Sequence, residues 1–343
     1  MAETVLVTGG TGYVGGWCVV ELLRRGFTVR TTVRSLSKEP AVRAAVSGAV
    51  DPGDRLTVVA ADLTSDDGWD AAVAGCDYVL HVASPLGVDD PKDPDTLIVP
   101  ARDGALRVLR AATRAGVKRV VLTSSTAAAS PPLAGPDSVN DETVWTDTED
   151  RRLNAYRKSK TISERAAWRF MEEHQGPTTL ATVLPGAVLG PVLTPDNLGS
   201  AQVVDRLMKG SIPGVPRLGF TVVDVRDLAD LHIRAMTSPE AAGQRFIGVT
   251  EFMWMAEIAE VLRSKLGTAA SKVPTRRLPS FLLRAISLFD PAIRSVTPSL
   301  DHKHVYTSEK AQRLLDWHPR PAATTVVDCA ESLTPQRGER VGG

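Results

Sequence analysis

The sequence predicts an α/β fold in which a doubly wound parallel sheet is joined to a smaller C-terminal lobe. Short β-branched runs alternate with Ala-, Leu- and Arg-rich helical stretches along the first half of the chain. The strand candidates are almost continuously apolar, which is typical of parallel strands that are buried on both faces. A β-α-β-α order then implies one parallel sheet with helices on both sides.

Six strand candidates and five helix candidates make up this alternating part. The strands are expected at Thr4–Thr8, Thr28–Val33, Leu56–Ala60, Tyr78–Val82, Arg119–Thr123 and Leu180–Leu184, and the helices at Tyr13–Arg25, Pro40–Val50, Trp69–Ala74, Ala101–Ala115 and Ala155–Glu173. Residues 185–216 are rich in Pro and Gly and are expected to be a loop-rich entry to the lobe. Strands at Phe220–Val223 and Arg245–Val249 and an amphipathic helix at Glu251–Leu266 follow.

Composition and charge exclude several classes of protein. The 343 residues carry 40 basic and 40 acidic side chains, so nothing favours nucleic-acid or anionic-membrane binding. Three cysteines, Cys18, Cys76 and Cys329, are far apart, which argues against a disulfide scaffold and against a metal site. The first residues resemble no signal peptide, and Phe281–Phe289 is too short to span a bilayer. We therefore expect a cytoplasmic protein in a reducing setting.

A glycine-rich segment joins the first strand candidate to the first helix candidate. It runs Thr8-Gly9-Gly10-Thr11-Gly12-Tyr13-Val14-Gly15. Glycines at 9, 12 and 15 allow a tight turn, a close approach of the backbone to a pyrophosphate, and close helix–strand packing. The phosphates would bind free N–H groups at the helix N-terminus. The alternative is an ordinary Gly-rich turn, but the position in the first β-α-β unit favours a Rossmann-type dinucleotide site.

The second strand candidate distinguishes between the two nicotinamide dinucleotides. NAD sites usually carry Asp or Glu near its end, whereas this chain has Arg34 there and Lys38 shortly after. Arginine can bind a 2′-phosphate bidentately, so we expect NADPH; the alternative is a solvated loop arginine. Asp62, after the third strand candidate, has two interpretations: it accepts a hydrogen bond from the adenine amino group, or it caps the turn Thr64–Asp67.

Tyr156 and Lys160 lie four residues apart on the long helix candidate, and therefore on one face. A nearby ammonium lowers the pKa of a phenol, which can then exchange a proton with a carbonyl oxygen. Such pairs also occur on solvated helices. Ser124 and Ser125 end the preceding strand, at the sheet edge where ligands bind in parallel α/β folds. The serine, the tyrosine, the lysine and the glycine loop are therefore expected to converge.

Several strings of residues together resemble the extended short-chain dehydrogenase/reductases, in particular the dihydroflavonol reductase, cinnamoyl-CoA reductase and microbial aldehyde/ketone reductase branch. The family has a Thr-Gly-x-x-Gly-x-x-Gly loop, a serine after the fifth strand and a Tyr-x-x-x-Lys motif. The strings that carry the closer resemblance are Thr28–Arg34, His81–Pro85, Leu122–Ser125, Asp141–Trp145, Asp224–Leu228 and Leu315–Pro321. The resemblance covers residues 4–332.

The resemblance implies a role for each matching position. Ser125 would hydrogen-bond the substrate carbonyl, Tyr156 would be the acid/base, and Lys160 would bind the nicotinamide ribose and tune Tyr156. The residues expected to bind NADP(H) are Gly9, Thr11, Gly12, Tyr13, Val14, Gly15, Arg34, Lys38, Asp62, Leu63, Val82, Ala83, Ser84, Thr123, Tyr156, Lys160, Pro185, Gly186 and Val188. Residues 1–185, with return segments near 220–250, would form the NADP-binding domain. Residues 186–219 and 251–332 would form the substrate-binding lobe, and 333–343 a flexible tail.

Departures from the branch's patterns bear on the substrate. Thr126–Pro132 contains no Asn, which counts against a dihydroflavonol. Asn154–Lys160 matches the cinnamoyl-CoA reductase string Asn-Trp-Tyr-Cys-Tyr-Gly-Lys only in part, which counts against a CoA thioester. A general small-molecule carbonyl substrate remains. The expected substrate contacts are Ser84, Leu86, Ser125, Thr126, Tyr156, Leu189, Leu193 and Phe220, and ordinary core packing is the alternative for the apolar ones.

We therefore expect an NADPH-dependent carbonyl reductase, a monomer or a homodimer, that turns aldehydes or ketones into alcohols. Nucleotide-sugar epimerases and dehydratases and hydroxysteroid dehydrogenases share the same parts, although epimerases usually have an acidic residue where Arg34 stands. A non-catalytic NADPH sensor is a further alternative, but such proteins commonly lose the Tyr/Lys pair. His81 is expected to be a hydrogen-bonded core histidine, and Trp69, Trp145 and Trp254 are expected to anchor packing.

Overall fold

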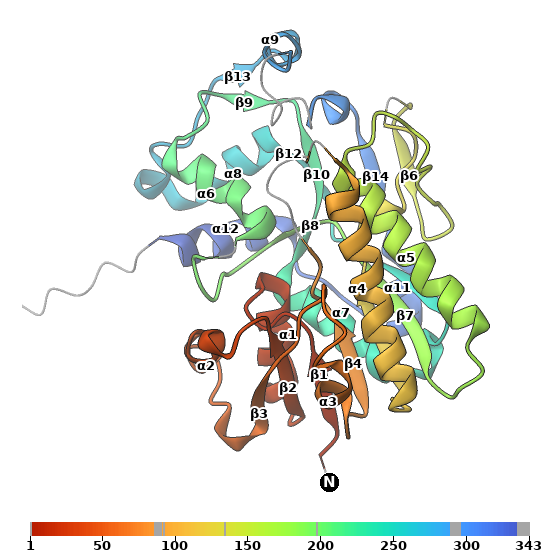
Figure 1. Cartoon of the computed structure of the whole chain (residues 1–343). Helices are drawn as coiled ribbons and strands as arrows, with labels where there is room; N and C mark the ends of the chain where they lie inside the picture. Colours follow the sequence, from red (N-terminus) through yellow and green to blue (C-terminus); the bar gives the residue numbers. More distant parts are fainter. Residues whose placement is uncertain are drawn as a thin grey trace, which may run out of the picture.

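A seven-stranded parallel sheet forms the centre of the computed structural model (Figure 1). The structure describes residues 2–85, 91, 93–133, 135–196, 198–288 and 296–334, so most of the expected tail lies outside it. The strand order is β11-β7-β5-β4-β1-β2-β3. The strands are β1 (Thr4–Val7), β2 (Thr28–Val33), β3 (Leu56–Ala60), β4 (Tyr78–His81), β5 (Arg119–Thr123), β7 (Thr179–Pro185) and β11 (Gln244–Gly248). The predicted doubly wound parallel sheet is confirmed.

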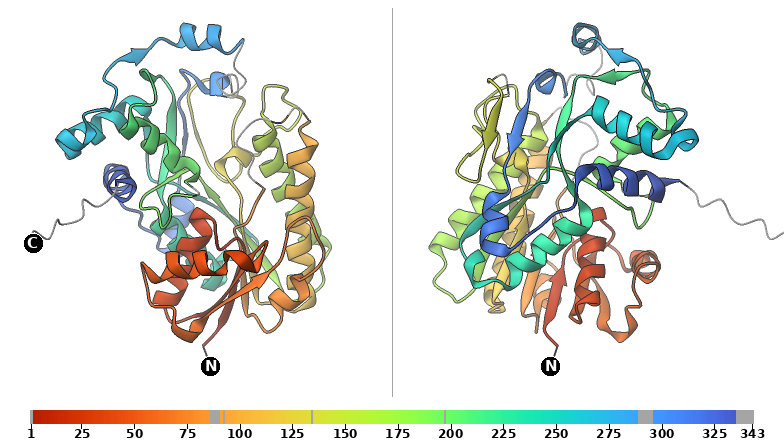
Figure 2. Two further views of the ribbon diagram at one scale, coloured as in Figure 1. Left: turned by 60° about the vertical axis from the view of Figure 1, so that its left-hand side comes forward. Right: turned by 180° about the vertical axis from the view of Figure 1, so that it is seen from behind.

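Helices cover both faces of this sheet (Figure 2). One face carries α1 (Tyr13–Arg24), α2 (Glu39–Ser47), α7 (Val225–Thr237) and α11 (Glu309–Leu315). The other carries α3 (Trp69–Val73), α4 (Asp95–Arg114) and α5 (Ala155–Glu173). Helix α1 packs against α7, and α4 packs against α5. Because the strands between these two helix layers are parallel, their carboxyl ends all lie at one edge of the sheet.

The apolar runs in the strands follow from this sandwich. In β1, the side chains of Val5 and Val7 belong to the core shared with α1 and α7, whereas Leu6 belongs to the core shared with α3 and α4. All three are fully buried. Successive side chains of a strand point to opposite faces, so a strand with helices on both sides requires apolar residues at every position.

A second, smaller body, here called the small lobe, is built around its own core (Figure 1). It contains a three-stranded sheet in the order β12-β10-β8 and the helices that pack around it. The elements are β8 (Ala187–Leu189), α6 (Gln202–Lys209), β10 (Gly219–Asp224), β12 (Phe252–Trp254), α8 (Met255–Leu266) and α12 (Ala322–Leu333). Two short strand pairs, β9 (Val215–Pro216) with β13 (Arg277–Leu278) and β6 (Ser138–Asn140) with β14 (His304–Tyr306), and α9 (Ser280–Ile286) complete the described elements.

The small lobe differs from the sequence prediction in three places. The expected loop at 185–216 contains α6, whose Val204 and Leu207 are fully buried although Pro- and Gly-rich segments flank the helix. The helix expected from Glu251 begins only at Met255, because the preceding residues form β12 and the Glu257 carboxylate accepts a hydrogen bond from the Trp254 N–H (2.8 Å). Of the two expected return segments, 245–249 joins the large sheet as β11, whereas 220–223 lies in β10 of the small lobe.

Helix α4 begins six residues before the expected start, at Asp95. Pro100 therefore lies inside the helix, although proline is unfavourable in a helix interior. Within the described residues, no helix is long and apolar enough to cross a membrane. The same part of the chain holds no group of three or more His, Cys, Asp or Glu side chains placed to bind a metal ion.

Candidate active site

The turn between β1 and α1 has room only for glycine at key positions. Gly9 has a φ of +78°, in the left-handed region that favours glycine. A Cβ on Gly15 would lie 2.4 Å from the Gly9 carbonyl oxygen, which no side chain allows. The N-cap, Gly12, has no side chain, and the first turn of α1 contains no acidic residue. The positive end of the helix dipole is therefore open to an anion, and the cradle fits a pyrophosphate.

Arg34 and Lys38 are exposed and follow the end of β2, at the same edge of the sheet. Asp62 follows β3, and its Oδ1 accepts hydrogen bonds from the Thr64 N–H and hydroxyl, both at 2.8 Å. These bonds hold the pKa of Asp62 below its usual value, and the charges of Arg34 and Arg107 lower it further. The turn interpretation of Asp62 is confirmed, whereas its contact with adenine stays a prediction.

The structure brings Ser125, Tyr156 and Lys160 together beside the carboxyl end of β5. The Tyr156 hydroxyl donates to Ser125 Oγ (3.4 Å), and the Lys160 ammonium donates to the carbonyl oxygen of Thr123 (3.3 Å). Helix α5 begins here because the Asn154 side chain caps it, accepting a hydrogen bond from the N–H of Arg157, the third residue of the helix (3.0 Å). The cap fixes which residues form the first turn and therefore places Tyr156 and Lys160 on the inner face.

Burial shifts the pKa of both groups. It lowers the pKa of Lys160 to about 8, and the charge of Glu164 opposes this shift. Burial raises the pKa of Tyr156, opposed by the hydrogen bond to Ser125 and by the charge of Arg157. The sequence predicted a lowered pKa for Tyr156, and in this structure that prediction is wrong because desolvation outweighs both opposing effects. The phenol therefore keeps its proton, which is the form that can protonate a carbonyl oxygen.

A buried carboxylate lies one helical turn beyond Lys160. Glu164 is 1% exposed and accepts hydrogen bonds from the hydroxyls of Ser124 (2.5 Å) and Thr182 (2.8 Å). Arg245 Nε, from β11, donates to the same carboxylate at 2.8 Å. The ion pair ties α5 to β11, and the two hydroxyl hydrogen bonds tie it to β7 and to the end of β5. The sequence analysis missed it, although the four-residue spacing from Lys160 places Glu164 on the same helix face.

Arg245 makes further contacts besides its ion pair with Glu164. Its Nη1 donates to the carbonyl oxygens of Glu142 (2.5 Å) and Val144 (3.0 Å). Its guanidinium carbon lies 3.7 Å from the centroid of the Trp145 ring. The desolvation cost of the buried pair with Glu164 is thus offset by further hydrogen bonds and a cation–π contact.

Two buried histidines near the site are neutral. His81 Nδ1 lies 2.9 Å from Thr8 Oγ1, and burial lowers its pKa to about 3. His232 Nδ1 donates to the Leu228 carbonyl (2.8 Å), so its Nε2 accepts from the Thr123 hydroxyl (2.7 Å), and burial lowers its pKa to about 4. The interpretation of His81 as a hydrogen-bonded core histidine is confirmed. Neither ring can act as an acid or base near neutral pH.

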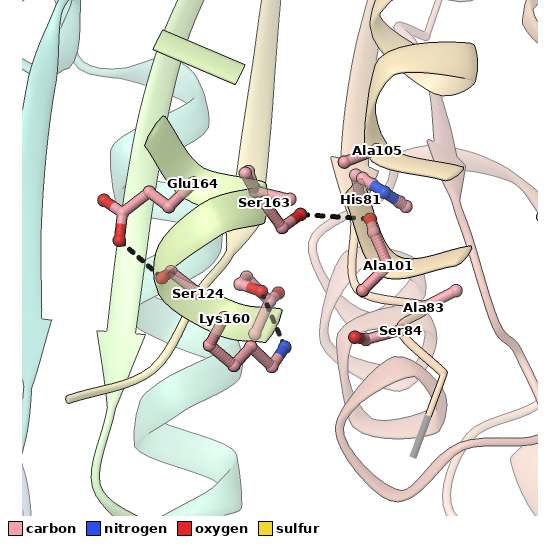
Figure 3. A pocket seen from close by; sticks show the side chains of 11 residues that line it. His81, Ala83, Ser84, Ala101, Ala105, Ser124, Lys160, Ser163 and Glu164 are labelled. Carbon is pink, nitrogen blue, oxygen red and sulfur yellow. Dashed lines mark hydrogen bonds between the residues drawn. The ribbon is translucent and has the colours of Figure 1, made fainter. Parts of the chain in front are cut away.

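A small cavity lies between α5, α4 and the end of β4. Figure 3 shows Lys160 and Ser124 on one side of it and Ala83 and Ser84 on the other. Ala83 and Ser84 are two of the positions expected beneath the cofactor ribose, and Lys160 is the residue expected to bind that ribose. The structure therefore places these predicted positions around a common space.

A larger open hollow lies between the start of α5 and the small lobe. Its described lining is Thr126, Arg157, Gly186, Ala187, Gly219, Phe220, Thr221, Phe252, Ser299, His302, His304 and Tyr306. Of the expected substrate contacts, Thr126 and Phe220 line it. Leu189 instead belongs to the core of the small lobe, and Leu193 packs against the core that α1 shares with α7. Leu86 lies outside the described residues.

The remaining predicted cofactor positions join the two bodies or surround the glycine turn. The Tyr13 hydroxyl donates to the Gly190 carbonyl (2.7 Å), so this side chain links α1 to the small lobe. A Cβ on Gly186 would lie 2.1 Å from the Thr221 carbonyl oxygen, which explains the glycine there. Pro185 ends β7, Val188 is buried, Val14, Leu63 and Val82 are half-buried, and Thr11 is exposed.

Comparison with known proteins identifies the family. The model of the NAD dependent epimerase/dehydratase family matches residues 5–247. The chain is 37% identical to cinnamoyl-CoA reductase 1 of Arabidopsis thaliana over 265 residues, covering 76% of this chain and 74% of that protein. It is 36% identical to a putative anthocyanidin reductase of Ginkgo biloba over 294 residues, covering 80% and 82%. The chain therefore belongs to the NAD dependent epimerase/dehydratase family.

Solved structures place it more narrowly. The yeast methylglyoxal/isovaleraldehyde reductase Gre2, complexed with NADPH, superposes with a TM-score of 0.79 at 25% identity, covering 96% of this chain and 98% of that one. A reductase studied by structure-guided engineering gives a TM-score of 0.80 at 27% identity, covering 97% and 99%. The predicted resemblance to the dihydroflavonol, cinnamoyl-CoA and aldehyde/ketone reductases is confirmed, and the chain is an oxidoreductase of that branch.

Proposed function

We propose that the protein is an NADPH-dependent carbonyl reductase that converts aldehydes or ketones into alcohols. The observation that carries the proposal is the hydrogen-bonded set of Ser125 and Tyr156 beside the buried ammonium of Lys160. It lies at the strand edge that also holds a glycine cradle suited to a pyrophosphate. The named activities of the relatives, which include a reductase solved with NADPH, support the same class.

The cofactor would be held by residues of the large sheet. Free N–H groups after Gly12 would bind the pyrophosphate, Arg34 and Lys38 would pair with the 2′-phosphate, and Lys160 would bind the nicotinamide ribose. NADPH would supply the hydride. The protein residues then have two tasks, to orient the carbonyl and to deliver a proton.

Ser125 and Tyr156 would perform those tasks together. Ser125 would donate a hydrogen bond to the substrate oxygen and hold it beside the Tyr156 hydroxyl. When the hydride reaches the carbonyl carbon, the C=O π bond opens and its electron pair takes the tyrosine proton. The tyrosinate left behind would be stabilised by the charges of Lys160 and Arg157 and be reprotonated from solvent. Each turnover thus consumes one hydride and one proton.

The proposal assigns a separate role to the large-sheet body and to the small lobe. Residues 1–185 with the return segment 245–249 would bind the cofactor, and 186–219 with 251–332, together with β10, would select the carbonyl substrate. Because the hollow lies where the small lobe meets the start of α5, a substrate there would reach both Ser125 and Tyr156. A cytoplasmic location and a monomeric or homodimeric state remain predictions.

The test is the oxidation of NADPH by the purified protein against a panel of aldehydes, ketones and diketones, followed by its absorbance. We expect turnover with several members and a preference over NADH. NADPH binding with no turnover on any carbonyl would contradict the proposal and favour a sensor. A tightly bound NAD that co-purifies, together with no consumption of added NADPH, would favour an epimerase or dehydratase.

A further inference from the structure

The hollow between α5 and the small lobe continues directly from the proposed catalytic residues. Two of its lining residues, Thr126 and Arg157, are the chain neighbours of Ser125 and Tyr156. Arg157 directly follows Tyr156, and its charge lowers the pKa of Tyr156. A group bound by Arg157 would therefore belong to the same molecule whose carbonyl reaches Tyr156.

Arg157 has no described acidic partner. Its Nη1 donates to the hydroxyl of Ser130 (3.0 Å), and no carboxylate of the described residues lies within ion-pair distance of it. None of the described residues that line the hollow is Asp or Glu. The first turn of α5 also lacks acidic side chains, so the positive end of its dipole adds to the charge of the guanidinium. The local field thus favours an anion.

An imidazole faces the same hollow. His302 stacks against His304, with the ring centroids 5.9 Å apart and the planes 5° from parallel. His304 is held in place by two polar contacts, since its Nε2 lies 3.3 Å from the Leu133 carbonyl oxygen and its Nδ1 lies 3.2 Å from the Ser138 hydroxyl oxygen. His302 can supply an N–H donor at the rim without adding any negative charge.

Part of the wall is aromatic. Phe220 of β10 and Phe252 of β12 both line the hollow. The tip of the Phe252 ring lies against Gly219 of β10, where a Cβ would come within 2.0 Å of Cζ, so only glycine leaves room for this ring. The hollow therefore combines an apolar surface, suited to a hydrocarbon or aromatic body, with a cationic end beside the reacting phenol.

We infer that the preferred substrate is an oxo acid, in which an apolar or aromatic body carries both the reacting carbonyl and a carboxylate that Arg157 binds. This inference rests on the proposed reductase function and names its substrate class. A guanidinium can donate two parallel hydrogen bonds to a carboxylate, which fixes the orientation of the substrate as well as adding affinity. Arg157 would thus be a specificity-determining residue.

The test compares each acid with its methyl ester, which keeps the carbonyl and the ring and removes the charge. Suitable pairs are phenylglyoxylate and para-formylbenzoate with their methyl esters. We expect kcat/KM to favour the acids by roughly tenfold to hundredfold, the usual effect of a hydrogen bond to a charged group. In Arg157→Gln the acid-to-ester ratio should fall towards one, and in Arg157→Lys it should fall only in part. Added salt should reduce the wild-type ratio.

Arg169→Gln is the matched control, because it removes an exposed arginine from the same helix well away from the hollow. Its acid-to-ester ratio should equal that of the wild type. A wild-type ratio of one or below would overturn the inference, even if Arg157→Gln does not fold. Reduction of other aldehydes and ketones, with none of the acids turned over, would also overturn it. Loss of all NADPH oxidation would instead contradict the proposed reductase function.

Discussion

The buried interior of the site and its charged rim are built in opposite ways. In the interior, the polar side chains of Lys160, Glu164 and Arg245 are hydrogen-bonded to described protein atoms. At the rim, Arg34 is exposed, and Arg157 has only a neutral hydroxyl as its described side-chain partner. Paired buried groups hold a fixed geometry, whereas cations without an acidic partner are available to a ligand.

This difference has measurable consequences. Changes in the interior should affect turnover or stability with every substrate, because they alter atoms that all reactions share. Changes at the rim should affect one ligand more than another and leave the fold intact, because the exposed charges contribute little to stability. The predictions below test this distinction, beginning with the largest expected effect.

Replacing Tyr156 with Phe should lower kcat by roughly a hundredfold to ten-thousandfold, the usual contribution of a positioned general acid. NADPH affinity, measured by fluorescence titration, should stay within about threefold, since only a hydroxyl is removed. Tyr78→Phe is the control, because Tyr78 begins β4 at the opposite end of the sheet and its hydroxyl reaches only Glu3 (3.4 Å). A Tyr156→Phe enzyme with near-normal kcat would show that the interior does not supply the proton.

Replacing Glu164 with Gln should destabilise the protein by about 3–5 kcal/mol, because it leaves the buried guanidinium of Arg245 with no opposite charge. Urea unfolding would measure the loss. The control is Glu260→Gln, which breaks an exposed ion pair with Arg263. The Glu260 side chain is 69% exposed, so this substitution should cost less than about 1 kcal/mol of stability. If both variants lost the same free energy of unfolding, the buried ion pair would contribute no more to stability than the exposed one.

Replacing Arg34 with Ala should lower kcat/KM for NADPH by roughly tenfold to hundredfold, because a charged hydrogen bond to the 2′-phosphate is lost. The value for NADH, which lacks that phosphate, should change far less. Kinetics with both cofactors would measure the two effects. An equal loss with NADH and NADPH would mean that Arg34 does not recognise the phosphate. The control is Arg25→Ala, which removes a surface charge at the far end of α1 and should leave both values unchanged.

The smallest effect concerns pH. Because burial lowers the pKa of Lys160 to about 8 while raising that of Tyr156, the ammonium loses its proton first as the pH rises. The reductive kcat/KM should therefore be level below about pH 8 and fall by about tenfold per pH unit above it. Lys160→Arg keeps its charge across this range and should remove the fall. A wild-type profile that stays level to pH 10 would contradict the assignment.

The sheet and the convergence of Ser125, Tyr156 and Lys160 were predictable because they depend on local patterns. The apolar strands, the glycine turn and the Tyr156–Lys160 spacing each lie within one short segment, and parallel strands bring their carboxyl ends together. The short helix α6 was missed because its eight residues lie among prolines and glycines. Asp62 kept two interpretations, since one carboxylate can serve both a turn and a ligand.

The buried pair and the hollow were not predictable for a different reason. Glu164 and Arg245 are 81 residues apart, and no local pattern shows that a charged residue will be buried or which residue will pair with it. The hollow draws its walls from segments between Thr126 and Tyr306. The sequence does not show which core an apolar side chain such as Leu189 or Leu193 will join. Both were expected in the substrate wall because they are apolar, a property that core residues share.

The distance in sequence between Glu164 and Arg245 also bears on how the protein is made. As the chain leaves the ribosome, the helix with the acid/base pair emerges well before the strand that neutralises its buried carboxylate. Until β11 docks at the edge of the sheet, that helix would have to bury a lone negative charge, which is too costly to persist. We therefore expect α5 to reach its final position late in folding, and chains truncated before Arg245 to depend on chaperones.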